Sequence, residues 1–304
     1  MRKASLTSAV CVLVTVLAAP LAGQMYLSDD EQDAIYTVDL TTGQATLVGP
    51  AGLDMSFSGL AYDSLNGVLY VSDVALLGEA AGPPTDGRNA RLTSPEGGTG
   101  WNLATVDLAS GALTIVGDHL TSSNIHGLAF DSANDVLYGA DIDNSGQLSV
   151  IDRATGASTP VGPWGTTTEI RGLAYDAASD TLYGVDYAPG SLYTIDRTTG
   201  AATLVGALGF ANGYYDGLEI DPASGVLYFV DDISLQLHSL DLATGQATPV
   251  GPLNGPSLPS GLAALGTAGP RTPLAIPALA WPGLALLALF LAYAASRHLR
   301  RSTG

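Results

Sequence analysis

The sequence predicts an all-β protein, a five-bladed β-propeller closed by pairing of its N- and C-terminal strands and followed by one C-terminal transmembrane helix. Three observations predict this fold class. A motif recurs at a spacing of about 45 residues. The two ends of the repeated region hold complementary parts of that motif, and a long apolar segment lies near the C-terminus.

The recurring motif starts with Gly-Leu and contains four short segments typical of strands. Full copies begin at Gly59, Gly127, Gly172 and Gly217, and each continues through Leu-Tyr-x-x-Asp, Asp-x-x-[Thr/Ser]-Gly and a final Val-Gly. Four strands with turn residues between them, in about 45 residues, match one propeller blade. The copies therefore predict four complete blades.

A fifth blade is predicted from two incomplete copies. Residues 25–49 supply a second, third and fourth strand without a first, whereas Gly261–Leu265 supplies a first strand alone. Pairing of Gly261–Leu265 with Met25–Asp29 closes the ring. A solenoid is the alternative, although a stack of repeats does not need complementary half-copies. The repeat resembles bacterial exported propellers of the YVTN and quinoprotein-like kind over most of residues 25–265, which implies a fold shared by many functions.

Both ends of the chain carry targeting features. Residues 1–23 have the basic start, apolar run and small residues of a signal peptide, and they contain the single cysteine, Cys11. We expect the propeller to span 24–266 and a linker 267–273. The apolar segment 274–296 is long enough to cross a bilayer, with a buried core helix as the alternative, and the basic tail 297–304 favours the cytoplasmic side.

The C-terminal segment resembles an IPTL-CTERM sorting tail, a relative of PEP-CTERM tails. The resemblance rests on Ile276-Pro277-Ala278-Leu279, the apolar run and the final arginines, with Ala278 where the family has threonine. It implies export, anchoring in the membrane and a sorting enzyme as a partner.

The charge distribution excludes one class of function. All 29 acidic residues lie between Asp29 and Asp241, and only five arginines lie in the body at 24–266, which gives a formal charge of −24 there. Nucleic-acid binders use Lys and Arg to displace counterions from phosphates. We therefore do not expect nucleic acid as a partner.

Candidate binding residues stand where the copies differ. The residue before each Gly-Leu changes from blade to blade and should lie at the mouth of the central channel, beside loops of variable length. Glu219 replaces an alanine of the other copies and is expected to need Arg171 or His126 as a cationic partner. The candidates are Ser58, His126, Arg171, Asp216, Glu219, Tyr214 and Tyr215, with the solvated ends of inner strands as the alternative interpretation.

A calcium loop is a second candidate site. Asp141, Asp143, Ser145 and Asp152 have the spacing of such a loop, although Asp141 and Asp152 also belong to the blade consensus. An insertion at about 74–101 is either a lid over the channel or an excursion from the blade.

The leading functional prediction is an exported, membrane-anchored binding module for an extracellular protein or glycan. The sequence has no Gly-x-Ser-x-Gly elbow or phosphate loop, so an enzyme is the less favoured class. The alternative is a calcium-assisted hydrolase or lactonase with axial acids, by resemblance to propellers of the gluconolactonase type.

Overall fold

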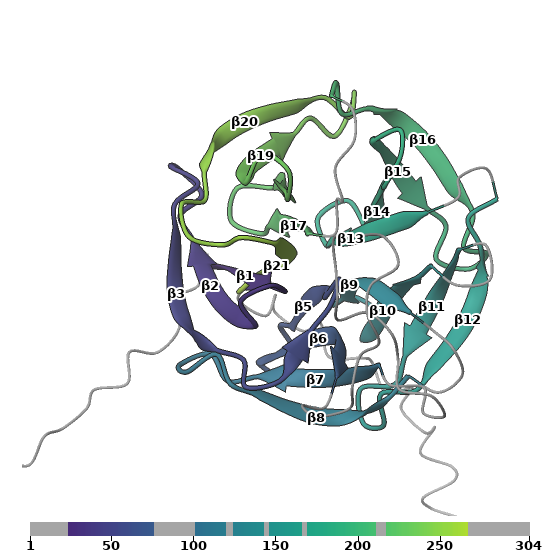
Figure 1. Cartoon of the computed structure of the whole chain (residues 1–304). Coiled ribbons are helices and arrows are strands. Elements are labelled where there is room, and N and C mark those ends of the chain that lie inside the picture. The colour runs from purple at the N-terminus through teal and green to yellow at the C-terminus, as the bar shows by residue number, and fades with distance from the viewer. Residues whose placement is uncertain are drawn as a thin grey trace, which may run out of the picture. The chain divides into compact units, whose positions relative to one another are not determined.

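The computed structural model describes residues 24–75, 101–119, 124–142, 146–165, 169–210 and 217–266. These residues form five antiparallel sheets arranged as the blades of a propeller (Figure 1). We number the blades in chain order. Blade 1 contains β21, β1, β2 and β3; blade 2 contains β5, β6, β7 and β8, with β4 also on β6; blades 3, 4 and 5 contain β9–β12, β13–β16 and β17–β20.

The strands are short, as the four segments of each repeat predict. Their bounds are β1 Met25–Asp29, β2 Ala34–Val38, β3 Ala45–Pro50, β4 Asp54–Met55, β5 Leu60–Asp63, β6 Val68–Ala75, β7 Asn102–Val106, β8 Leu113–Asp118, β9 Ile125–Asp131, β10 Val136–Asp141, β11 Gln147–Ile151, β12 Ser158–Pro163, β13 Ile170–Asp176, β14 Thr181–Asp186, β15 Ser191–Ile195, β16 Ala202–Ala207, β17 Leu218–Asp221, β18 Val226–Asp231, β19 Gln236–Leu240, β20 Ala247–Pro252 and β21 Pro259–Ala264.

The ring is closed by the two ends of the repeated region, which confirms the five-bladed prediction. β21 pairs antiparallel with β1, and Leu27 lies opposite Leu262. The ladder is extended by a hydrogen bond from Leu265 N–H to the carbonyl of Gln24, 2.8 Å long. Blade 1 is therefore assembled from residues more than 200 positions apart in the sequence.

Backbones pack against backbones where the innermost strands meet. β5, β9, β13, β17 and β21 contact each other in ring order. A Cβ at Gly59 would lie 2.2 Å from the carbonyl oxygen of His126, and one at Gly127 would lie 2.1 Å from that of Arg171. Real side chains never come this close, so the Gly of Gly-Leu is required by the crowding of five strands at the axis.

Each blade is also joined to the next at the rim. The first residue of every outer strand donates a hydrogen bond of 2.8–3.0 Å to the residue that follows the outer strand of the preceding blade. In each blade the residue whose carbonyl accepts this bond is buried between two blades, and we call it a plug residue. The five plug residues are Ala51, His119, Trp164, Leu208 and Leu253.

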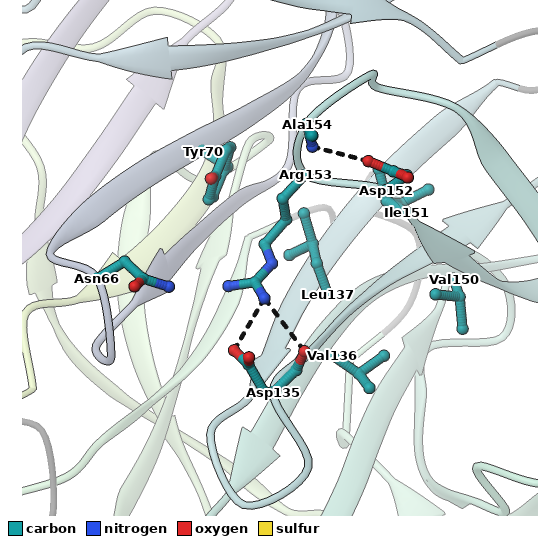
Figure 2. Close-up of a pocket in the computed structure, with 10 residues that line it drawn as sticks. All are labelled: Asn66, Tyr70, Asp135, Val136, Leu137, Val150, Ile151, Asp152, Arg153 and Ala154. Carbon is teal, nitrogen blue, oxygen red and sulfur yellow. Dashed lines mark hydrogen bonds and ion pairs between the residues drawn. The ribbon is translucent and has the colours of Figure 1, made fainter. Parts of the chain in front are cut away.

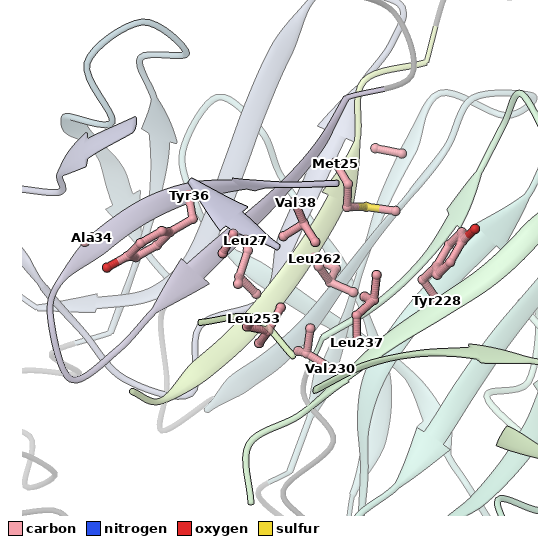
Figure 3. Close-up of a cluster of buried hydrophobic side chains, with 12 residues drawn as sticks. Met25, Leu27, Ala34, Tyr36, Val38, Tyr228, Val230, Leu237, Leu253 and Leu262 are labelled. Atoms are coloured by element: carbon pink, nitrogen blue, oxygen red, sulfur yellow. The ribbon is translucent and has the colours of Figure 1, made fainter. Parts of the chain in front are cut away.

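Apolar side chains fill the seams between blades. Figure 3 shows the seam of blades 1 and 5, where Met25, Leu27 and Leu262 of blade 1 pack against Tyr228 and Val230 of blade 5. Because Leu262 belongs to β21, the closing strand buries its side chain in a seam and also completes a sheet. Removal of β21 is expected to expose apolar surface on both sides of this strand.

Some predicted boundaries change. Val74 and Ala75 were expected inside the insertion at 74–101, but they belong to β6, where they pair with Met55 and Asp54. The remainder of the insertion, residues 76–100, lies outside the described residues, as do 1–23, 267–273, 274–296 and 297–304. Within the ranges listed above, no helix has the length and apolarity to cross a membrane.

Candidate binding site at the mouth of the propeller

The links between strands define two faces of the ring. First-to-second links and the Asp-x-x-[Thr/Ser]-Gly turns share one, which we call the constant face. Second-to-third and fourth-to-first links share the opposite one, which we call the variable face, because consecutive strands run antiparallel. The residues before each Gly-Leu lie where the inner strands reach the variable face. We call this place the mouth.

Two predicted mouth residues belong to the closure of the ring. Ser58 and Ser260 are 0% and 2% exposed, and their hydroxyls donate to the carboxylate of Asp30, each over 2.6 Å. The N–H of Ser58 bonds to the same carboxylate at 3.1 Å. Buried polar groups need such partners. These serines therefore fasten blade 2 and the closing strand to blade 1.

Sequence reasoning missed Asp30, although a signal was present. It follows the Leu-Tyr-x-x-Asp-type segment of blade 1, where the other blades have Val74, Ile142, Tyr187 and Asp232. This position varies between blades as much as the residue before Gly-Leu does.

Blades 2, 3 and 4 bring aromatic and cationic groups together at the mouth. The Phe57 ring of blade 2 stacks on the His126 ring of blade 3, with centroids 4.8 Å apart and planes 6° from parallel. The Arg171 guanidinium of blade 4 lies 5.5 Å from the Phe57 centroid. The stacked rings of Phe57 and His126 therefore join blades 2 and 3, and Arg171 adds blade 4 to the same group.

Arg171 holds two further groups of its own blade. Its guanidinium lies 4.5 Å from the centroid of the Tyr187 ring, and its Nη2 donates to Oε2 of Glu169 at 3.1 Å. The Arg171 side chain is 9% exposed and that of Glu169 is 39% exposed. The pair therefore presents a carboxylate to solvent and keeps the guanidinium inside. Phe57, Glu169 and Tyr187 were not predicted, because the prediction for the mouth was based on the residue before Gly-Leu; Tyr187 stands at the position that Asp30 has in blade 1.

Phe57 has an unusual backbone. Its φ is +50°, in the left-handed region that a bulky side chain rarely adopts. The chain is fixed on both sides, by Met55 paired with Val74 and by Ser58 bonded to Asp30. The strain is consequently built into the loop that carries the partly exposed ring.

Glu219 lies deeper along the axis than the mouth residues. Its Oε1 accepts a 2.8 Å hydrogen bond from the N–H of Ile220, and the N–H of Ala264 in the closing strand also bonds to the carboxylate. Burial raises the pKa of Glu219 to about 8, against the opposite effect of these two bonds. The expected pairing with Arg171 is not among its described contacts, because Glu219 is three positions further along the inner strand than the mouth.

The remaining candidates at the mouth are not described. Tyr214, Tyr215 and Asp216 lie outside the described residues, as do Asp143 and Ser145 of the predicted calcium loop.

The calcium-loop spacing does not bring its two flanking acids together. Asp141 pairs with Gln147 at one end of the β10–β11 ladder, whereas Ile151, just before Asp152, pairs with Leu137 at the other end. Four residue steps of about 3.3 Å each separate these ends, whereas calcium ligands lie about 2.3–2.6 Å from the ion. Asp152 instead caps a turn, accepting N–H bonds from Ala154 and Thr155. Throughout the described ranges, no three His, Cys, Asp or Glu residues are placed to hold a metal ion.

A hollow of about 450 Å³ lies on the constant face between blades 2 and 3 (Figure 2). Arg153 crosses it, bonding to Asp63 of blade 2 and, at 2.8 Å, to Asp135 of blade 3. Arg197 repeats the arrangement one blade later, with Asp131 and Asp180. Because the arrangement recurs at the next pair of blades, we interpret the hollow as part of the contact between blades, which an ion-paired arginine stabilises.

The comparisons with known proteins bear on the fold. No protein-family model matches this chain, and no curated protein is similar to it in sequence. A chain in the crystal structure of a nidogen/laminin complex is similar in structure, with a TM-score of 0.51 and 14% identity, over 81% of this chain and 99% of that one. A structural genomics protein of unknown function from Bacteroides thetaiotaomicron has a TM-score of 0.52 and 17% identity, over 82% of this chain and 64% of that one. At these identities the likeness shows the fold alone.

Replacement of Glu219 by glutamine should flatten the dependence of stability on pH. Because the folded-state pKa is raised to about 8, the native state binds more protons than the unfolded state above the ordinary carboxyl pKa. Stability of the wild type should therefore fall as pH rises from about 5 to about 8, by at most about 1.4 kcal/mol per pH unit. Urea unfolding of the wild type and of Glu219→Gln at several pH values across this range measures the free energy of unfolding.

The matched control is Asp241→Asn. The N–H groups of Ala243 and Thr244 lower the pKa of Asp241, so its titration lies below this window. A wild type and a Glu219→Gln variant with parallel stability curves between pH 5 and 8 would show that Glu219 is ionised in the folded protein.

Proposed function

We propose that this protein is an exported, membrane-anchored binding module that holds an extracellular ligand at the mouth of its variable face. The observation that carries the proposal is the group formed by Phe57, His126, Arg171, Glu169 and Tyr187. Blades 2, 3 and 4 contribute to it, and both Phe57 and Tyr187 are partly exposed. Exposed aromatic residues with polar groups fixed around them are typical of binding surfaces.

The strained Phe57 supports a functional origin for this group. A phenylalanine in the left-handed backbone conformation costs free energy that a glycine at the same position would not. Relief of this strain by glycine would offset the loss of the ring contacts with His126 and Arg171, so folding alone gives little reason for a phenylalanine there. The retained ring is best explained by a contact that it makes with a ligand.

Export and anchoring rest on the sequence. The signal-like segment 1–23, the apolar segment 274–296 and the basic tail 297–304 support a body outside the cytoplasm, with a sorting enzyme as a partner during export.

The topology is tested by labelling single cysteines with a membrane-impermeant maleimide. Ser234→Cys lies at an exposed site in the β18–β19 link, and Ser302→Cys lies in the basic tail. In intact spheroplasts, Ser234→Cys should react at once and Ser302→Cys only after the membrane is permeabilised. The mature chain should supply no other thiol, because Cys11 leaves with the signal. Labelling of both sites, or of Ser302→Cys alone, before permeabilisation contradicts the proposed orientation.

The role of Phe57 is tested by comparing two phenylalanines. Phe57→Gly should change the free energy of unfolding by less than about 1 kcal/mol, because relief of strain offsets the lost ring contacts. Phe229→Ala should cost about 3–5 kcal/mol, because Phe229 is 0% exposed. Urea unfolding of both variants measures the difference. If Phe57→Gly destabilises the protein as much as Phe229→Ala, the ring serves folding and the main support for the binding site is lost.

A further inference from the structure

We infer that the ligand of the mouth is a cationic segment of a polypeptide, which places a Lys or Arg side chain against Tyr187 and Phe57 and beside the carboxylate of Glu169. This inference rests on the proposed function and names the chemical class of the partner.

The first argument is the electrostatic field of the body. Its formal charge of −24 arises from 29 acids and five arginines, without one lysine. Such a field concentrates cations and repels anions at distances beyond direct contact. A basic partner therefore associates faster than a neutral one, and an acidic partner is disfavoured before it reaches the surface.

The second argument is the chemistry of the groups that solvent reaches at the mouth. The rings of Phe57 and Tyr187 are partly exposed, and the Glu169 side chain is 39% exposed. Aromatic faces and a carboxylate both attract a Lys or Arg head, and the rings also accommodate its aliphatic stem. All three groups lie around one side-chain head, because the Arg171 guanidinium contacts each of them.

The third argument concerns Arg171 itself, which could otherwise favour an anion. Its side chain is 9% exposed and is paired with Glu169 at 3.1 Å. A ligand therefore meets the carboxylate of this pair more readily than its guanidinium. Arg171 acts as a positioning residue, since its guanidinium contacts both the Glu169 carboxylate and the Tyr187 ring.

The test measures binding of a fluorescein-labelled decapeptide of alternating lysine and glycine to the full-length chain in phosphatidylcholine vesicles. Ionic strength is held at about 0.15 M, where interactions between charges more than about 8 Å apart are largely screened. Glu169→Gln and Tyr187→Ala should each weaken binding about fivefold or more. Glu31→Gln is the matched control, because Glu31 is exposed in the β1–β2 link of the same face and the change removes the same charge. It should weaken binding less than about twofold.

The outcomes separate the ligand class from the proposed function. Equal effects of Glu169→Gln and Glu31→Gln would show that the peptide senses only the overall field, which overturns the inference. Binding of a glutamate–glycine decapeptide or of cellohexaose that depends on Tyr187 and Phe57 would also overturn the cationic class, yet it would support the mouth as a binding site. If Phe57→Gly and Tyr187→Ala leave the binding of all three probes unchanged, both the inference and the proposed function are wrong. Glu169→Gln keeps the shape of the side chain, so the test does not depend on the folding of Tyr187→Ala.

Discussion

The pairing of β21 with β1 is the contact on which the rest of the structure depends. In every other blade the four strands follow one another along the chain, whereas blade 1 receives its innermost strand from the far end of the repeated region. Where the covalent turn is missing, the backbone hydrogen bond from Leu265 N–H to the Gln24 carbonyl continues the ladder. At the opposite end of the strand, at the mouth, the Asp30 carboxylate accepts a hydrogen bond from the Ser260 hydroxyl. The ring is a closed structure only while this non-covalent seam holds.

The same seam shapes the candidate site. The Asp30 carboxylate that receives Ser260 from the closing strand also receives Ser58, and Ser58 follows the strained Phe57 directly. Closure of the ring and the position of the Phe57 ring are thus fixed by one buried carboxylate. Phe57 then reaches His126 and Arg171 in the next two blades. A site of this kind exists only in the assembled ring, because no single blade contains it.

The fold could be predicted from the sequence because each blade repeats the same sequence motif. Gly-Leu marks the crowded axis, and the half-copies at the two ends specify the closure. The site could be predicted only in part. His126 and Arg171 stood at a recognisable position, and Asp30 and Tyr187 share a second variable position that was overlooked, whereas Phe57 and Glu169 act through loop contacts that a repeat does not encode. The prediction linked Glu219 to Arg171 by opposite charge and did not take into account how far along the inner strand Glu219 lies. The spacing of the predicted calcium loop did not reveal that an antiparallel ladder carries Asp152 away from Asp141.

The closing seam is tested most directly by a disulfide between Leu27→Cys and Leu262→Cys, which lie opposite each other in the β1–β21 ladder. Cys11 is replaced by serine, so that the pair holds the only thiols. Oxidation should give an intramolecular disulfide and raise the free energy of unfolding by up to about 4–5 kcal/mol over the reduced form of the same variant. Two free thiols that persist in the folded, oxidised protein would contradict the pairing of these strands and the closed ring with it.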